Sequence, residues 1–120
     1  MKNVLIAEDN NDLRNIFSKS FDKTIFDVRL AIDGEEAIAK INELLPDIII
    51  LDVDMPKVSG FGVLDYLKET NRRPKVILVT GNTIAADAPQ AEFADLVLVK
   101  PVSIRELITF VNRFTQSAQE

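Results

Sequence analysis

The chain has 120 residues, 47% of them hydrophobic and 28% charged, which suits one globular domain and excludes a disordered or collagen-like chain. It has no histidine and no cysteine, so Ser-His-Asp and Cys-His catalytic sets and the usual zinc sites are excluded. The 19 acidic and 14 basic residues give a net charge of -5, which disfavours direct binding to nucleic acid.

Five short apolar runs alternate with segments of helical spacing from one end of the chain to the other. The runs cover residues 4–7, 26–32, 48–51, 76–79 and 96–99. Four of them are almost wholly apolar, as expected of strands buried on both faces of a parallel sheet. The second alternates, with Phe26, Val28, Leu30 and Ile32 on one side, and is predicted to be an edge strand with one more exposed face.

The segments between the runs predict helices. They cover residues 13–21, 33–45, 60–69, 84–94 and 103–114. The second has a capping box of Asp33 and Glu36 and ends before Pro46. Pro89 lies in the middle of the fourth, which we expect to be short or broken. The fifth begins at Ser103 and has the clearest amphipathic stripe.

Alternating strands and helices predict an α/β fold, a doubly wound five-stranded parallel sheet with right-handed crossovers and helices on both faces. We expect residues 1–120 to form a single domain, in which residues 115–120 are a polar tail. The first apolar run is too short for a signal peptide, and no run is long enough for a membrane span. The sequence therefore predicts a cytoplasmic protein without a membrane partner.

Polar and charged residues follow the predicted strands. Glu8 and Asp9 come after the first strand, Asp52 ends the third, Thr80 ends the fourth, and Lys100 follows the fifth. Taken singly, such residues also serve as helix caps, turn residues or solvated lysines. The carboxyl ends of parallel strands meet at one edge of the sheet, where such folds bind ligands. We therefore expect these five side chains to converge on one site.

Three clustered carboxylates repel one another, so some would keep their protons unless a cation is bound. Mg²⁺ prefers oxygen ligands, takes one or two carboxylates and accepts phosphate oxygens. The cluster thus predicts a magnesium site that handles phosphate, with Asp52 as the candidate nucleophile for an aspartyl-phosphate. Thr80 would donate a hydrogen bond to a phosphoryl oxygen, and Lys100 would place its positive charge against another.

These residues belong to four motifs that together identify a family. The motifs are Glu8-Asp9-Asn10, Asp52-Val53-Asp54-Met55-Pro56 followed by Gly60, Thr80, and Lys100-Pro101. In order and spacing the chain resembles response-regulator receiver domains of two-component signalling, and the resemblance covers essentially the whole chain. It implies the strand order 2-1-3-4-5 of chemotaxis regulators, in a flavodoxin-like sandwich of three layers.

The resemblance also implies a role for each acidic residue. Asp52 is the expected phosphoacceptor. Asp9, Asp52 and the backbone carbonyl of Asp54 are the expected direct ligands of Mg²⁺. Glu8 would assist in binding the ion, through a water molecule.

By the same resemblance, Thr80 is the switch hydroxyl and Lys100 is the salt-bridge partner of the phosphoryl group. The phosphoryl donor would be a phosphohistidine on a histidine kinase or a histidine phosphotransfer protein, which fits the absence of histidine from this chain. The receiver would catalyse only its own phosphorylation and dephosphorylation. It would switch the binding of an unknown downstream protein through the Thr80 loop and the face formed by the fourth helix, fifth strand and fifth helix. Asp54 and Asn82 are predicted to flank the water that hydrolyses the acyl phosphate.

The chain departs from the family pattern in its last third. Val97 stands where the family often has Tyr or Phe, Gly81 where Ala is more common, and Phe93-Ala94 where Gly-Ala is usual. These differences lie near the fourth helix and fifth strand. We therefore expect a working phosphorylation site with a modified output surface.

Two other functions compete with this interpretation. Residues 48–54 resemble the first motif of haloacid-dehalogenase phosphatases, in which an apolar strand ends in two aspartates one residue apart. However, Pro56 stands where that motif has Thr or Val, and the chain is short for such an enzyme. Val97 keeps open a pseudo-receiver that binds partners without being phosphorylated.

Overall fold

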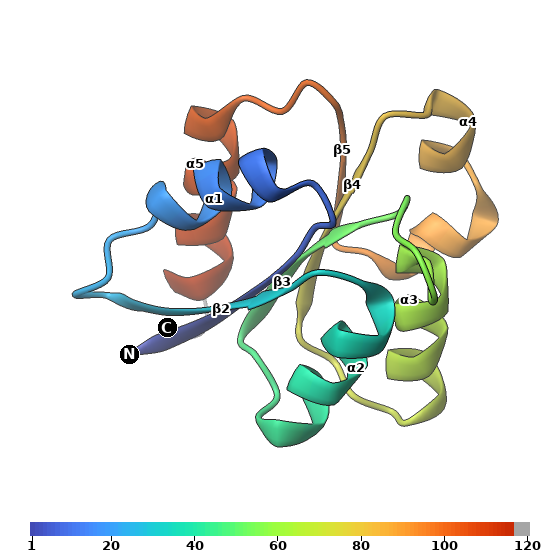
Figure 1. Ribbon diagram of the computed structural model, residues 1–120, viewed down its shortest axis with the longest axis horizontal. Coiled ribbons are helices and arrows are strands. Elements are labelled where there is room, and N and C mark those ends of the chain that lie inside the picture. Colours follow the sequence, from blue (N-terminus) through green and yellow to red (C-terminus); the bar gives the residue numbers. More distant parts are fainter. Residues whose placement is uncertain (117–120) are drawn as a thin grey trace.

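Strands and helices alternate along the chain as the hydrophobic pattern predicts, in a computed structural model that describes residues 1–116 (Figure 1). The strands are β1 (Lys2–Ala7), β2 (Phe26–Ala31), β3 (Ile48–Asp52), β4 (Lys75–Thr80) and β5 (Leu96–Val99). The helices are α1 (Asn11–Lys19), α2 (Gly34–Glu43), α3 (Gly60–Glu69), α4 (Thr83–Ala86), the 3-10 helix η1 (Pro89–Phe93) and α5 (Ile104–Gln116).

The strands form one parallel sheet in the order β2-β1-β3-β4-β5, which confirms the predicted order and the edge position of β2. The last residue of β1, Ala7, pairs with Ala31 of β2 and Leu51 of β3. Asp52, at the end of β3, pairs with Val79 of β4. The strands therefore end at nearly the same level, and the residues that follow them lie on one edge of the sheet.

One detail of β2 differs from the predicted alternation. The strand ends at Ala31, which is fully buried, while Ile32 lies beyond it and is 48% exposed. Ala31 belongs to the same buried cluster as Ala7 of β1 and Ala37 of α2. Small side chains at these three positions allow α2 to pack close to the sheet, so size as well as hydrophobicity decides which residues are buried here.

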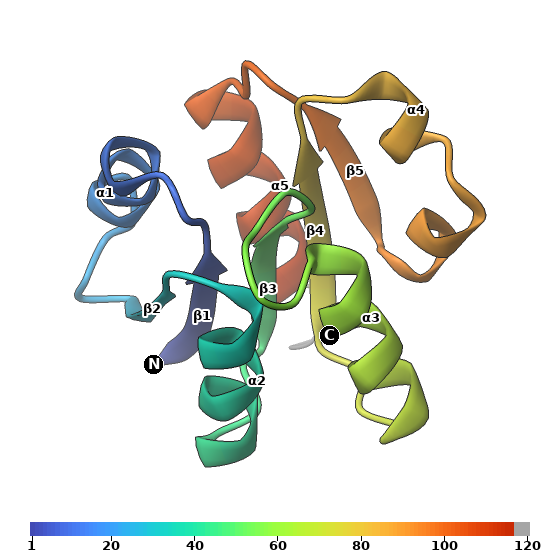
Figure 2. The ribbon, with the colours of Figure 1, turned by 45° about the vertical axis from the view of Figure 1, so that its right-hand side comes forward.

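Helices cover both faces of the sheet, which confirms the predicted three-layer arrangement (Figures 1 and 2). One core cluster contains Phe17 of α1 and Leu107 and Val111 of α5. The cluster on the other face contains buried residues of α2, α3 and η1. Successive strand residues such as Leu5 and Ile6 belong to opposite clusters and are both fully buried. Burial on both faces is the physical reason why the central strands are almost wholly apolar.

Each α-helix begins at a residue whose side chain accepts a hydrogen bond from a backbone N–H group, whereas η1 has no such cap. Asp33 caps α2 by accepting from the Glu36 amide at 2.7 Å, and Ser103 accepts from the Glu106 amide at 3.2 Å, as predicted. The capping box differs in one contact. The Glu36 carboxylate accepts from the Ile32 amide at 3.2 Å, one residue before the cap, instead of from the amide of the cap residue.

The fourth helix is short and broken, as predicted from Pro89. It consists of α4, one turn long, followed by η1, in which Pro89 takes the first position. The end of the chain differs from the prediction, because α5 continues to Gln116. Thr115 is buried, and its hydroxyl donates to the Val111 carbonyl at 2.8 Å. The first two residues of the predicted polar tail are thus helical, and residues 117–120 lie outside the described part of the chain.

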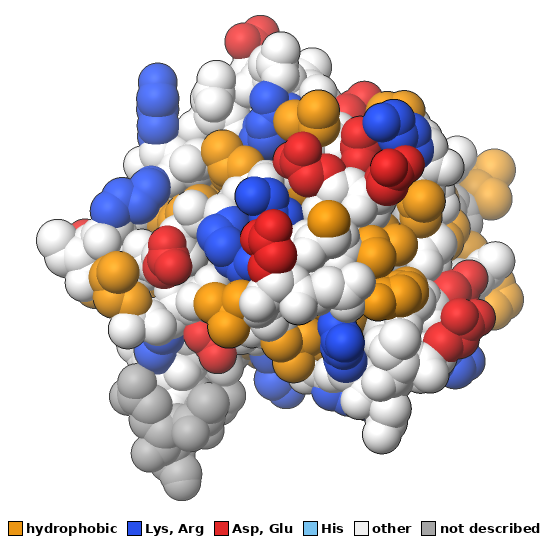
Figure 3. All heavy atoms as spheres, turned by 60° about the horizontal axis from the view of Figure 1, so that its bottom comes forward, with side chains coloured by type: hydrophobic (Ala, Val, Ile, Leu, Met, Phe, Trp, Pro, Cys, Tyr) orange, Lys and Arg blue, Asp and Glu red, His pale blue; other side chains and the backbone are white. Residues whose placement is uncertain are grey.

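The surface gives no sign of a single large charged region on the face seen in Figure 3, where acidic, basic and hydrophobic side chains are interspersed. Over residues 1–116, the helices are all too short or too polar to cross a bilayer.

Gly60 lies against the backbone of Asp52, and this contact generates a first prediction. A Cβ atom on Gly60 would lie 2.4 Å from the Asp52 carbonyl oxygen, so Gly60→Ala must displace the end of β3. We expect it to lower the free energy of unfolding by about 1–3 kcal/mol, measured by urea denaturation.

Gly81→Ala is the matched control, because a Cβ at Gly81 meets no atom within 4 Å. It should leave the stability unchanged or raise it slightly, since alanine restricts the unfolded chain more than glycine does. Equal effects of the two substitutions would contradict the steric explanation.

Candidate functional site

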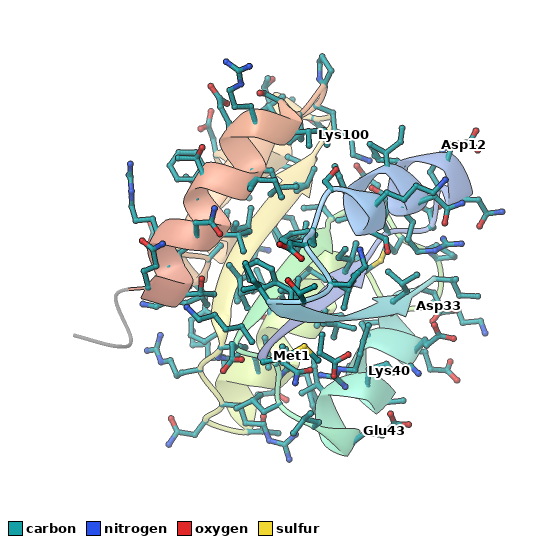
Figure 4. All side chains as sticks on the ribbon, turned by 90° about the vertical axis from the view of Figure 1, so that its left-hand side faces the viewer. Met1, Asp12, Asp33, Lys40, Glu43 and Lys100 are labelled. Atoms are coloured by element: carbon teal, nitrogen blue, oxygen red, sulfur yellow. The ribbon has the colours of Figure 1, made fainter. Side chains whose placement is uncertain are left out.

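The structure brings the five predicted residues to the carboxyl edge of the sheet. Glu8 and Asp9 follow β1, Asp52 ends β3, Thr80 ends β4 and Lys100 follows β5. Figure 4 shows Lys100 at the end of the molecule away from Met1, where β1 begins. Glu8, Asp9 and Asp52 each offer a carboxylate oxygen within 4.8 Å of the others. The predicted convergence of the acidic residues and Lys100 is therefore present.

Hydrogen bonds hold both the backbone and the side chain of Glu8. Its amide donates to the Ala31 carbonyl at 3.1 Å, and its Oε2 accepts from the Asn10 amide at 3.1 Å. Oε1 lies 3.1 Å from Lys100 Nζ. Within residues 1–116, Oε1 is nonetheless buried without a hydrogen bond of regular geometry. The carboxylate is fixed in place, and Oε1 faces Lys100 with lone-pair capacity left for a further cation.

Asp52 is almost completely buried, with an exposed fraction of 2%. Its Oδ1 accepts from the Asp54 amide at 3.2 Å, and its Oδ2 lies 3.5 Å from Lys100 Nζ. The Val53 amide donates to the Val79 carbonyl at 2.9 Å, so the strand pairing continues past the acidic residue. Asp52 is therefore a rigidly held carboxylate facing a single ammonium group.

The protonation of Asp52 is shifted by this environment. Burial, followed by the charge of Glu8, raises the pKa of Asp52 from 3.8 to about 7, while Lys100 acts in the opposite direction. For Lys100, burial lowers the pKa, but the charges of Asp52 and Glu8 outweigh it and the net shift is upward. One ammonium group thus does not compensate two buried carboxylates.

Thr80 is fully buried and is connected to the start of α4. Its Oγ1 accepts from the Asn82 amide at 3.1 Å, and its carbonyl accepts from the Lys100 amide at 2.8 Å. The Asn82 side chain accepts from the Ile84 amide at 2.9 Å and so caps α4. Asp54 is exposed, and the acidic cluster that includes Asp52 is formed without its side chain. The family resemblance implies Asp54 as a ligand through its backbone carbonyl and not through its side chain.

The sequence did not predict Arg14 at the site, and it named Gly60 within a motif without giving it a role. Gly60 packs on the Asp52 backbone, and Arg14 donates from Nη1 to the Glu8 carbonyl at 2.8 Å. A local signal for Arg14 exists, because the Asn10 cap places it in the first turn of α1, where long side chains point back over the preceding turn. The contact of Gly60 depends on the packing of α3 against β3 and has no local signal.

The residues of the cluster fit a magnesium ion. All three carboxylates are hard oxygen donors, which Mg²⁺ prefers, and Glu8 Oε1 is buried without a regular hydrogen-bond donor among the described residues. An added dication would also offset the excess negative charge that raises the pKa of Asp52.

Comparisons with known proteins agree with this fold. The family model described as response regulator receiver domain matches residues 4–112, and the chain belongs to that family. It is 34% identical over 105 residues to a relative from Guillardia theta named probable transcriptional regulator ycf27. This match covers 87% of the chain but 41% of the relative, so the chain spans less than half of that protein's length.

Solved structures of receiver domains are similar over nearly the whole chain. The receiver domain of a Francisella response regulator has a TM-score of 0.87 and 29% identity, covering 98% of this chain and 99% of that one. The response regulator TrrA from Thermotoga maritima, in complex with Mg²⁺ and BeF, has a TM-score of 0.86 and 27% identity, covering 95% and 99%. These matches confirm the predicted family and do not favour a haloacid-dehalogenase-like phosphatase.

The raised pKa of Asp52 predicts a pH dependence of stability in metal-free protein. Between about pH 4 and pH 7 the folded chain keeps a proton on Asp52 that the unfolded chain loses, so stability falls as the pH rises through this range. Asp52→Asn stays neutral and avoids this loss. At pH 8 we expect the variant to be more stable than the wild type, by at most a few kcal/mol, and at pH 4 the difference should be smallest.

The measurement is urea denaturation of both proteins between pH 4 and pH 8 in the presence of a chelator. Other titrating groups are common to the two proteins and cancel in the difference. Stability curves that stay parallel across this range would show that the pKa of Asp52 is not raised.

Proposed function

We propose that this receiver domain accepts a phosphoryl group on Asp52 from a phosphohistidine of a histidine kinase or phosphotransfer protein, in a magnesium-dependent reaction. The observation that carries the proposal is the buried Asp52 carboxylate, which shares Lys100 with Glu8 and lies within 4.8 Å of the other two acidic residues. The chain would catalyse only its own phosphorylation and dephosphorylation. The proposed donor places this function in the cytoplasm.

The chemistry follows from the charges at the site. A carboxylate oxygen of Asp52 attacks the phosphorus, the P–N bond to the donor imidazole breaks, and the imidazole leaves with the bonding electron pair and takes up a proton. Glu8, Asp9, Asp52 and the Asp54 carbonyl would hold Mg²⁺, which supplies positive charge against the phosphoryl oxygens. Lys100 lies 3.5 Å from Asp52 Oδ2 and adds a cation against the charge that develops during transfer.

The switch would begin at Thr80. Its Oγ1 accepts from the Asn82 amide, and Asn82 caps α4. If the Thr80 hydroxyl turns to donate to a phosphoryl oxygen, the contact with Asn82 changes, and with it the start of α4. Because α4 is a single turn, little helical structure resists such a change.

The output surface would be the face formed by α4, β5 and α5. Ile84 on α4 is 80% exposed and Val99 on β5 is 41% exposed, so this face offers apolar side chains to a partner protein. Val97 is partly buried against the core and has no ring that could rotate. We therefore assign the coupling to the Thr80–Asn82 contact. The downstream partner would be a protein, with no direct role for nucleic acid or membrane.

The central test is incubation with Mg²⁺ and acetyl phosphate, followed by intact mass measurement. The wild type should gain one phosphoryl group, and Asp52→Asn should gain none, because an amide cannot form the acyl phosphate. Asp54→Asn is the matched control and should still be labelled. An unlabelled wild type, or equal labelling of wild type and Asp52→Asn, would refute the proposal.

A second experiment addresses the lifetime of the acyl phosphate. Asp54→Asn should change the rate of autodephosphorylation severalfold, because this exposed residue would flank the attacking water. Its effect on Mg²⁺ affinity should be small, since the carboxylate lies outside the cluster of Glu8, Asp9 and Asp52. The decay of the phosphorylated species is followed by mass after removal of the donor, and an unchanged rate would remove this role of Asp54.

A further inference from the structure

The turn between β1 and α1 carries two of the three clustered carboxylates and is bridged by one guanidinium group. Arg14 Nη1 donates to the Glu8 carbonyl at 2.8 Å and approaches the Asp9 carbonyl at 3.4 Å. Its Nη2 donates to the Asn11 side chain. Arg14 therefore contacts the backbone of both acidic residues and the first residue of the helix that follows.

The two acidic residues are not held equally well by the rest of the structure. Glu8 is buried and is fixed by the Ala31 carbonyl and the Asn10 amide. Asp9 is the exposed member of the cluster. Coulomb repulsion pushes the three carboxylates apart when no dication is bound, and the least buried one is the most free to move. Arg14 adds a contact on the Asp9 side of the turn.

The geometry of the contact depends on the shape of the arginine side chain. A guanidinium group is planar and has five N–H donors in a fixed fork, so it can bridge two carbonyls and a side-chain amide at once. A lysine ammonium carries the same charge without this fork. Arg14 Nη1 contacts the backbone carbonyls of Glu8 and Asp9, so Arg14 acts on the backbone of the turn.

We infer that Arg14 is a positioning residue for the magnesium site, which fixes the backbone of Glu8 and Asp9 so that their carboxylates face Asp52. The inference rests on the proposed function in so far as Mg²⁺ is the ion bound. Its consequence is that Arg14 preorganises the site before the ion arrives, and removing it lowers the affinity for Mg²⁺ without altering the reacting groups.

The test compares Arg14→Met and Arg14→Lys with Lys19→Met in the full chain. Lys19 is exposed in the last turn of the same helix, so Lys19→Met removes one positive charge from α1 and leaves the turn intact. Isothermal titration calorimetry with Mg²⁺ should show affinity about tenfold weaker for both Arg14 variants. Lys19→Met should bind like the wild type.

Two further readouts separate positioning from general destabilisation. In metal-free protein the Asn10 amide, which donates to Glu8 Oε2, should exchange its hydrogen faster in the Arg14 variants than in Lys19→Met. In phosphorylation by acetyl phosphate, the half-saturating Mg²⁺ concentration should rise in the Arg14 variants, while the maximal rate at saturating Mg²⁺ stays near that of the wild type. Thermal unfolding shows which variants are folded. If Arg14→Met is unfolded, Arg14→Lys alone is compared with Lys19→Met.

The outcomes distinguish the inference from the proposed function. Wild-type affinity in Arg14→Lys would show that charge alone suffices, and an equal loss in Lys19→Met would show a general charge effect, so either result overturns the inference. A wild type that binds Mg²⁺ but is not phosphorylated refutes the proposed function, while the affinities still decide the role of Arg14. Failure of the wild type to bind Mg²⁺ overturns both.

Discussion

The organisation of the site depends on two buried carboxylates that share one ammonium group. Glu8 and Asp52 have exposed fractions of 1% and 2%, and Lys100 Nζ lies 3.1 Å and 3.5 Å from their oxygens. Removing an ion from water costs several kcal/mol after relaxation, and one cation does not offset two such charges. Burial and this uncompensated negative charge together raise the pKa of Asp52. A site with this imbalance gains more than a neutral one from an added dication.

The strands and the convergence of acidic residues at one edge of the sheet could be predicted from the sequence, because both follow from general constraints. Wholly apolar runs indicate strands buried on both faces, and parallel strands place the residues that follow them at one edge. The strand order entered through the family resemblance, because hydrophobic patterns do not specify it. The burial of Ala31 in place of Ile32 and the contact between Gly60 and Asp52 depend on how closely helices approach the sheet. Such distances are set by tertiary packing, which local patterns do not contain.

The region after β4 links the end of the strand to two short helices. Thr80 accepts from the Asn82 amide, and Asn82 in turn caps α4, which is only four residues long. Pro89 then starts η1, so the sequence replaces one long helix by two short pieces. Short helices gain little from internal hydrogen bonding and depend on tertiary contacts. A change at the Thr80 hydroxyl can therefore be passed to this segment at low energetic cost.

The loop that follows Asp52 is held by the neighbouring helix α2 and not by charge. Lys57 has a φ of 67°, which costs about 1–2 kcal/mol for a residue with a side chain. Its ion pair with Asp33, at 3.6 Å, is largely exposed on the lysine side and contributes little. The stronger constraint is steric, since a Cβ on Gly34 would lie 1.9 Å from the Val58 carbonyl oxygen. The start of α2 thus supports the loop after β3 by close packing, as Arg14 supports the turn after β1 by hydrogen bonds. Both supports act on the backbone and occupy no carboxylate oxygen of the acidic cluster.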